Sequence, residues 1–154
     1  MIIYTDGSCL GNGKAANKGG FGVVVLDKDE NLCYNYNKFC ENTTNNREEL
    51  KAILYSFLNY GVNTNNPLYG FSTCSIPVVY SDSNYCVQTF NEWMFNWARN
   101  GWVKSDKKTP ENLDLIQAYY EVAVSDETKV FGQFLQMLES HAHSHDAGTD
   151  AAVI

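Results

Sequence analysis

The chain has 154 residues, of which 44% are hydrophobic and 19% are charged, and these proportions exclude a disordered protein. The length suits one folded unit, so we expect a single domain over residues 1–154. The net charge of −7 argues mildly against a nucleic-acid partner, because proteins that bind phosphate backbones usually carry excess lysine and arginine.

Nothing in the sequence predicts export or membrane insertion. Residues 1–6 lack the basic and apolar regions of a signal peptide, and no apolar run approaches the ~18–20 residues of a membrane helix. The five cysteines are an odd number without a C-x-x-C spacing. We therefore expect reduced, mostly buried thiols in a cytoplasmic, monomeric protein without membrane contact. The cysteines are Cys9, Cys33, Cys40, Cys74 and Cys86.

The first 40 residues predict three strands joined by short turns. The apolar segments 1–9, 19–26 and 32–40 are separated by Gly11-Asn12-Gly13 and by the polar segment 27–31, both of which are typical of turns. Three strands connected in this way predict an antiparallel meander.

Helical periodicity begins after these strands. Apolar residues at i, i+3, i+4, i+7 and i+8 predict an amphipathic helix, with Asn45 or Asn46 as its cap. These apolar residues are Leu50, Ile53, Leu54, Phe57 and Leu58.

The rest of the chain alternates between strand and helix patterns. We expect a buried strand at 76–80, a helix at 83–98, a polar stretch at 99–109, a helix from Pro110 to about 124, a strand at 129–138 and a short final helix from 146. This order predicts an α/β fold with a mixed five-stranded sheet, an antiparallel meander plus parallel strands, flanked by helices.

Asp6 is the first candidate site residue. It lies inside a strand that is otherwise suited to burial. A buried carboxylate is costly unless it is paired or binds a metal. The alternative is a turn or hydrogen-bonded structural residue, which is the commoner role of such an aspartate.

Two adjacent glutamates, Glu48 and Glu49, open the first helix, and helix phase separates them. Relative to the apolar stripe, Glu48 lies about 160° away and Glu49 about 100° away. We therefore expect Glu48 to face water and Glu49 to lie at the edge of the stripe, within reach of the sheet. The alternative is that both only interact favourably with the helix dipole.

Asp82 directly follows the short buried strand, at a junction with a helix. It is a candidate metal ligand, and a helix cap is an equally good interpretation.

The segment 141–150 is dense in potential ligands. His141, His143 and His145 alternate, but alternate residues of an extended chain form a row and do not easily surround one ion. We therefore favour a loop histidine that assists proton transfer over a transition-metal site.

Together these segments resemble the type 1 ribonuclease H family, in the same order along essentially the whole chain. The matching motifs are Tyr-Thr-Asp-Gly-Ser-Cys at 4–9, Thr-Asn-Asn-Arg-x-Glu-Leu at 44–50, Tyr-Ser-Asp-Ser-x-Tyr at 80–85, Trp97, Gly-Trp at 101–102, Asp-Lys-Lys at 106–108, Asn-Leu-Asp-Leu-Ile at 112–116 and the closing His-Ala…Asp-Ala-Ala pattern.

The resemblance implies a ribonuclease H-like fold and an endonuclease that hydrolyses the RNA strand of RNA/DNA hybrids. It assigns two Mg²⁺ ions, with Mn²⁺ as an alternative, to Asp6, Glu49, Asp82 and Asp150, and implies 5′-phosphate and 3′-hydroxyl products. His141 matches the family's loop histidine, although His143 and His145 are close enough to take that role. The alternative function is a ribonuclease H-like module that binds hybrids without cleaving them.

The resemblance also implies a substrate-binding surface. Asn12, Thr44, Asn45 and Asn84 match positions that contact the hybrid, although the family usually has glutamine in place of Asn84. A basic protrusion is expected from Trp93, Trp97, Arg99, Trp102, Lys104, Lys107 and Lys108. The competing interpretation is that the tryptophans belong to the core and the lysines to a solvated face.

Overall fold

The computed structural model describes residues 1–60, 78–124 and 134–137. Within this part of the chain a single mixed sheet has the strand order β3-β2-β1-β4-β5. Its strands are β1 (Ile2–Leu10), β2 (Lys18–Leu26), β3 (Leu32–Glu41), β4 (Val78–Ser81) and β5 (Phe134–Met137).

The strand directions follow the predicted pattern. β1 and β2 are antiparallel, as are β2 and β3, whereas β4 is parallel to both β1 and β5. The antiparallel meander of β1, β2 and β3 is therefore extended by the parallel strands β4 and β5. The five-stranded mixed sheet predicted from the sequence is confirmed. The predicted strands at 76–80 and 129–138 are each observed in part, since residues 76–77, 129–133 and 138 lie outside the described residues.

Helix α1 (Asn45–Tyr60) packs across β1 and β2. Its apolar residues form the main core together with the strand residues whose side chains point toward the helix. The buried set includes Ile3, Val23, Val25, Leu50, Ile53, Phe57 and Val79. Leu58 is the exception to the predicted stripe, since 52% of it is exposed.

The cap of α1 differs from the prediction. Thr44 Oγ1 accepts a hydrogen bond from the Arg47 amide at 3.1 Å, so Thr44 caps the helix and Asn45 is its first residue. The predicted caps, Asn45 and Asn46, already lie inside the first turn. The choice among three consecutive cap-forming residues depends on where the chain leaves the sheet.

The helix predicted at 83–98 is interrupted. It consists of α3 (Asn84–Gln88), a π-helical segment η1 (Thr89–Trp93) and α4 (Met94–Arg99). In a regular α-helix, residues four apart drift by about 40° around the axis. The wider π-helical turn reduces this drift, which keeps Cys86, Phe90 and Met94 on one buried face.

The next helix, α5 (Leu113–Val124), begins three residues later than predicted from Pro110. Asn112 has a φ of 58°, which is not helical, and its carbonyl accepts the amides of Leu115 and Ile116. The predicted final helix from residue 146 lies outside the described residues. None of the helices in the described ranges is long and apolar enough to span a membrane.

Candidate metal centre

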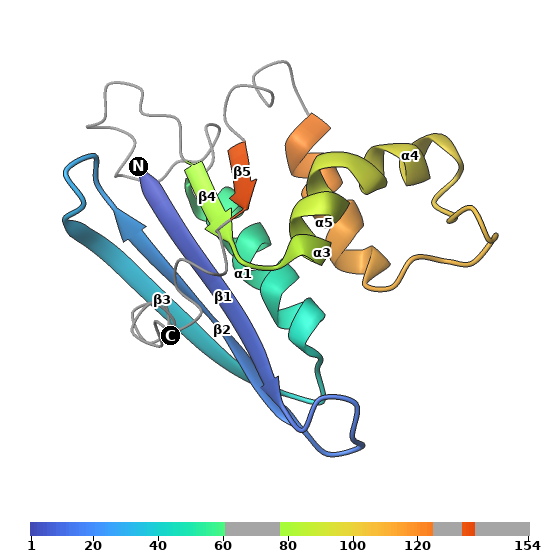
Figure 1. The fold of residues 1–154 in the computed structure, drawn as a ribbon, viewed down its shortest axis with the longest axis horizontal. Coiled ribbons are helices and arrows are strands. Elements are labelled where there is room, and N and C mark those ends of the chain that lie inside the picture. Colours follow the sequence, from blue (N-terminus) through green and yellow to red (C-terminus); the bar gives the residue numbers. More distant parts are fainter. Residues whose placement is uncertain (61–77, 125–133, 138–154) are drawn as a thin grey trace.

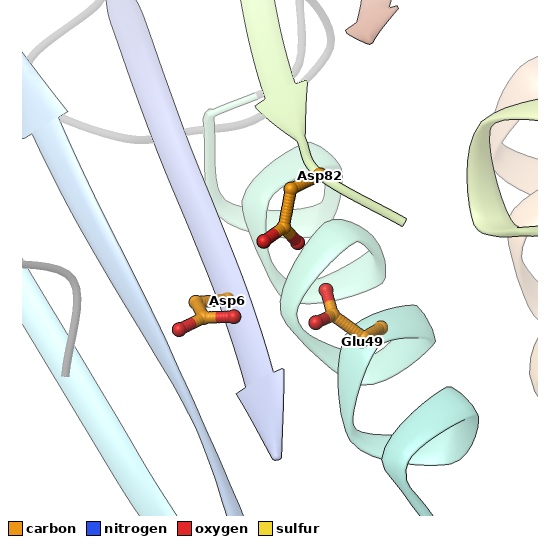
Figure 2. Close-up of side chains that lie close together, drawn as sticks. All are labelled: Asp6, Glu49 and Asp82. Carbon is orange, nitrogen blue, oxygen red and sulfur yellow. The ribbon is translucent and has the colours of Figure 1, made fainter. Parts of the chain in front are cut away.

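Three carboxylates from distant parts of the sequence meet beside the middle of β1, where the shorter strand β4 ends. Asp6 lies on β1, Glu49 just after the first turn of α1, and Asp82 directly after β4. One carboxylate oxygen from each lies within 4.8 Å of the others. Figure 2 shows the three side chains pointing toward one another.

The end of the parallel pairing between β1 and β4 creates this meeting point. Their last paired residues are Tyr4 and Tyr80, and each aspartate follows two residues later. Ligand sites in α/β sheets commonly lie beyond the carboxyl ends of parallel strands, where the backbones separate.

Gly7 brings Glu49 to this position. A Cβ atom at Gly7 would lie 2.3 Å from the Glu49 nitrogen and 2.4 Å from the Glu48 carbonyl carbon, which is far inside van der Waals contact. Only a residue without a side chain lets α1 approach β1 so closely. This role of Gly7 was not predicted from the sequence, although a glycine directly after a strand aspartate indicates a close backbone approach.

The negative charges of the three carboxylates repel one another, and a bound cation would relieve this repulsion. Burial of Glu49, followed by the negative charges of Asp82 and Asp6, raises the pKa of its carboxyl well above the usual value, although the Gly7 amide partly opposes this shift. Glu49 Oε2 is buried and has no hydrogen-bond partner. Carboxylate oxygens are the ligands that hard cations prefer, so these residues fit a metal ion.

The cap alternative for Asp82 does not apply. Ser83 is the N-cap of α3, and its side chain accepts a hydrogen bond from the Cys86 amide. Asp82 is half-buried, and its carboxylate belongs to the cluster.

The prediction that Glu48 faces water is wrong, because its side chain is fully buried. Glu48 Oε2 accepts a hydrogen bond from Thr43 Oγ1 at 2.6 Å and pairs with Lys51 Nζ at 2.7 Å. The sheet has glycines beneath this turn, and a Cβ atom at Gly19 would lie 3.2 Å from Glu48 Cγ. A helical wheel describes only the residues of the helix itself, so it cannot predict that glycines in a facing strand leave room to bury Glu48.

The cysteines also differ from the expectation of mostly buried thiols. Of the four in the described ranges, only Cys86 is buried, whereas Cys33 is exposed and Cys9 and Cys40 are half-buried. Cys86 lies near the cluster, and its burial, together with the charges of Glu49 and Asp82, raises the pKa of its thiol to about 12. Cys74 lies outside the described residues.

Three of the predicted substrate-binding residues lie together at the start of α1. The Asn45 amide donates to Asn12 Oδ1 at 3.0 Å, which joins the β1–β2 loop to the first turn of the helix beside Thr44. All three are exposed, as is Asn84, the first residue of α3. The structure thus places Asn84 two residues after Asp82.

Trp93 is the last residue of η1, and the other residues of the expected protrusion lie on α4 and the loop after it, which extend away from the sheet (Figure 1). Arg99, Lys107 and Lys108 are exposed, and Lys104 is half-buried. Two of the three tryptophans fit the interpretation as core residues, and one is exposed enough to belong to a binding surface. Trp97 and Trp102 pack against the core, whereas Trp93 is 38% exposed.

The remaining predicted site residues, Asp150 and His141, lie outside the described residues, as do His143 and His145.

The sequence model of a known family, RNase H, matches residues 1–148. The chain belongs to the ribonuclease H family. Ribonuclease H of Caldanaerobacter subterraneus subsp. tengcongensis is 38% identical over 125 residues, which cover 79% of this chain and 69% of that protein. Ribonuclease H of Symbiobacterium thermophilum is 38% identical over 126 residues, which cover 80% of this chain and 74% of that protein. The predicted ribonuclease H enzyme is thereby confirmed.

Solved structures agree on the ribonuclease H fold. The foamy viral protease-reverse transcriptase in complex with RNA/DNA hybrid has a TM-score of 0.74 at 15% identity, over 99% of this chain and 19% of the viral one. LC11-RNase H1 in complex with RNA/DNA hybrid has a TM-score of 0.63 at 21% identity, over 99% of this chain and 92% of that one. The fold predicted from the sequence is confirmed.

Proposed function

We propose that this ribonuclease H hydrolyses the RNA strand of RNA/DNA hybrids and leaves 5′-phosphate and 3′-hydroxyl ends. The observation that carries the proposal is the carboxylate cluster of Asp6, Glu49 and Asp82, with ligand oxygens within 4.8 Å, in a chain of this family. Two solved structures that share the fold are complexes with RNA/DNA hybrid, which supports the same class of substrate.

The proposed metal site consists of the three clustered carboxylates together with Asp150. Two bound Mg²⁺ ions, or Mn²⁺ in their place, would supply an activated water and stabilise the leaving 3′ oxygen. The protein's contribution is a fixed set of oxygens. Glu49 offers a buried oxygen without a hydrogen-bond partner, and Asp6 lies in the part of β1 that is paired with β2.

The proposed substrate contacts extend from this cluster in two directions. The exposed polar side chains of Asn12, Thr44, Asn45 and Asn84 would contact phosphates and the 2′-hydroxyls that distinguish a hybrid from a DNA duplex. Trp93 and the exposed cations of α4 and its loop would hold the duplex further away. The cations of this proposed surface would offset the overall charge of −7 where they meet the hybrid.

His141 is proposed to assist proton transfer from its loop. The single domain, the monomeric state and the cytoplasmic location remain predictions.

A cleavage assay tests the proposal. Labelled RNA/DNA hybrid, RNA duplex and single-stranded RNA are incubated with the protein in Mg²⁺ or Mn²⁺, and we expect only the hybrid to be cut. Asp6→Asn should reduce cleavage to background and leave hybrid binding in EDTA intact, because it removes a ligand charge without changing the shape of the side chain.

The control is Asp29→Asn, which makes the same chemical change in an exposed turn and should cleave like the wild type. A wild-type protein that binds the hybrid but never cuts it with either metal would contradict the proposal and favour the non-cleaving module.

A further inference from the structure

β1 and β4 separate just before the residues that carry the carboxylates. The two strands pair through three residues and the last pair is Tyr4–Tyr80, whose rings also stack with centroids 5.4 Å apart. Asp6 and Asp82 both lie beyond this pair. The spacing of the two aspartates therefore depends on whatever holds the strands where the backbone pairing has ended.

The side chain of Thr5 crosses this fork. Thr5 Oγ1 donates a hydrogen bond to the Tyr80 carbonyl at 2.8 Å. Thr5 is 2% exposed and directly precedes Asp6. The hydrogen bond is partly buried, and separating its two groups would cost its free energy, so this contact resists widening of the gap.

Neighbouring serines fix the main chain around Asp82. The Ser83 amide donates to Ser81 Oγ at 3.1 Å, which closes a turn around Asp82, and Ser83 Oγ accepts the Cys86 amide at 3.2 Å. The segment from Ser81 into α3 is thus held as one unit. The Thr5 hydroxyl joins this unit to β1.

We propose that Thr5 is a positioning residue that sets the spacing between Asp6 and Asp82, and hence the affinity of the centre for divalent cations. Thr5 acts through the two carboxylates and does not itself bind the ion. The inference rests on the proposed function only in taking the cluster to be a divalent-metal centre.

Two substitutions separate positioning from packing. Thr5→Val keeps the volume and removes the hydroxyl, whereas Thr5→Ser keeps the hydroxyl and removes a buried methyl group. Both should lower the melting temperature. By calorimetric titration with Mn²⁺ in the absence of substrate, affinity should fall about tenfold in Thr5→Val and stay within about twofold of wild type in Thr5→Ser. Cleavage by Thr5→Val should recover at high metal concentration.

Ser56→Ala is the control for loss of a buried hydroxyl. Ser56 Oγ donates to the Ala52 carbonyl at 2.9 Å within α1, and Ser56 is fully buried. This variant should lose stability without losing Mn²⁺ affinity. If Thr5→Val does not fold, Thr5→Ala against Thr5→Ser makes the same comparison at smaller volume.

Equal Mn²⁺ affinity in Thr5→Val and wild type would overturn the positioning role and leave the proposed function intact. Equal losses in Thr5→Val and Thr5→Ser would also overturn it, since packing would then explain both. A wild-type protein that binds no Mn²⁺ would instead overturn the proposed metal site, and this inference with it.

Discussion

Replacing Gly7 with alanine is expected to separate α1 from β1 at the point where they carry Glu49 and Asp6. The new Cβ atom would lie 2.3 Å from the Glu49 nitrogen, whereas ordinary Cβ contacts begin at 3.4 Å. The three nearest atoms, the Glu49 nitrogen and the Glu48 carbonyl carbon and oxygen, all belong to the backbone of α1, so no side chain can rotate away to make room. The first turn of the helix must retreat by about 1 Å.

The retreat affects stability and activity differently. Overpacking of this kind costs about 1–3 kcal/mol, which for a domain of this size lowers the melting temperature by roughly 2–12 °C. Such a loss leaves most domains folded at 25 °C, because typical stabilities are about 5–15 kcal/mol. A shift of about 1 Å in a catalytic group can lower activity about 100-fold. We therefore expect a folded protein with severely reduced cleavage and weaker metal binding.

The measurements are thermal unfolding by circular dichroism, Mn²⁺ titration, and hybrid cleavage at a temperature well below the melting point of the variant. Gly13→Asn is the control, because a Cβ atom there meets nothing within 4 Å and asparagine tolerates its φ of 86°. Wild-type cleavage and metal affinity in Gly7→Ala would refute the argument that this close approach positions Glu49.

Two further predictions follow from the electrostatics of the site. Glu49→Gln should raise the melting temperature of the metal-free protein by an amount that grows as the pH rises above 4.5, since a raised pKa means that wild-type stability falls as pH rises through the folded-state pKa. Thermal unfolding in EDTA up to about pH 8 measures the difference, and a constant offset would contradict it. At about pH 8, iodoacetamide should label exposed Cys33 in the folded protein but Cys86 only after unfolding, because Cys86 is buried with a pKa of about 12. Peptide mass mapping detects the labelled thiols, and rapid labelling of native Cys86 would contradict the packing.

Much of the fold was predictable because the local patterns are strong. Apolar segments separated by turn residues predicted the meander, and the apolar spacing from Leu50 onward predicted α1 to within its cap. The element boundaries that failed did so where tertiary packing decided them. The π-helical segment serves the burial of Phe90 and Met94, and the late start of α5 follows from the left-handed backbone of Asn112.

The choice of Glu49 over Glu48 shows how sequence reasoning can select the glutamate that joins the carboxylate cluster through an incomplete argument. Helix phase correctly directed Glu49 toward the sheet, and the structure places it beside Asp6 and Asp82. The same reasoning wrongly exposed Glu48. A helical wheel contains no information about Gly7 and Gly19, which let the sheet approach the helix on a second side.

The sequence by itself determined the residue types of the site and the strands and helices that carry them, because periodicity and residue preference are local properties of the chain. Only the tertiary structure decided that Asp6, Glu49 and Asp82 meet within 4.8 Å. That distance depends on the fork between β1 and β4, on the hydroxyl of Thr5 that crosses it, and on the missing side chain of Gly7. Each of these is a contact between segments far apart in the chain, and no local pattern encodes such a contact.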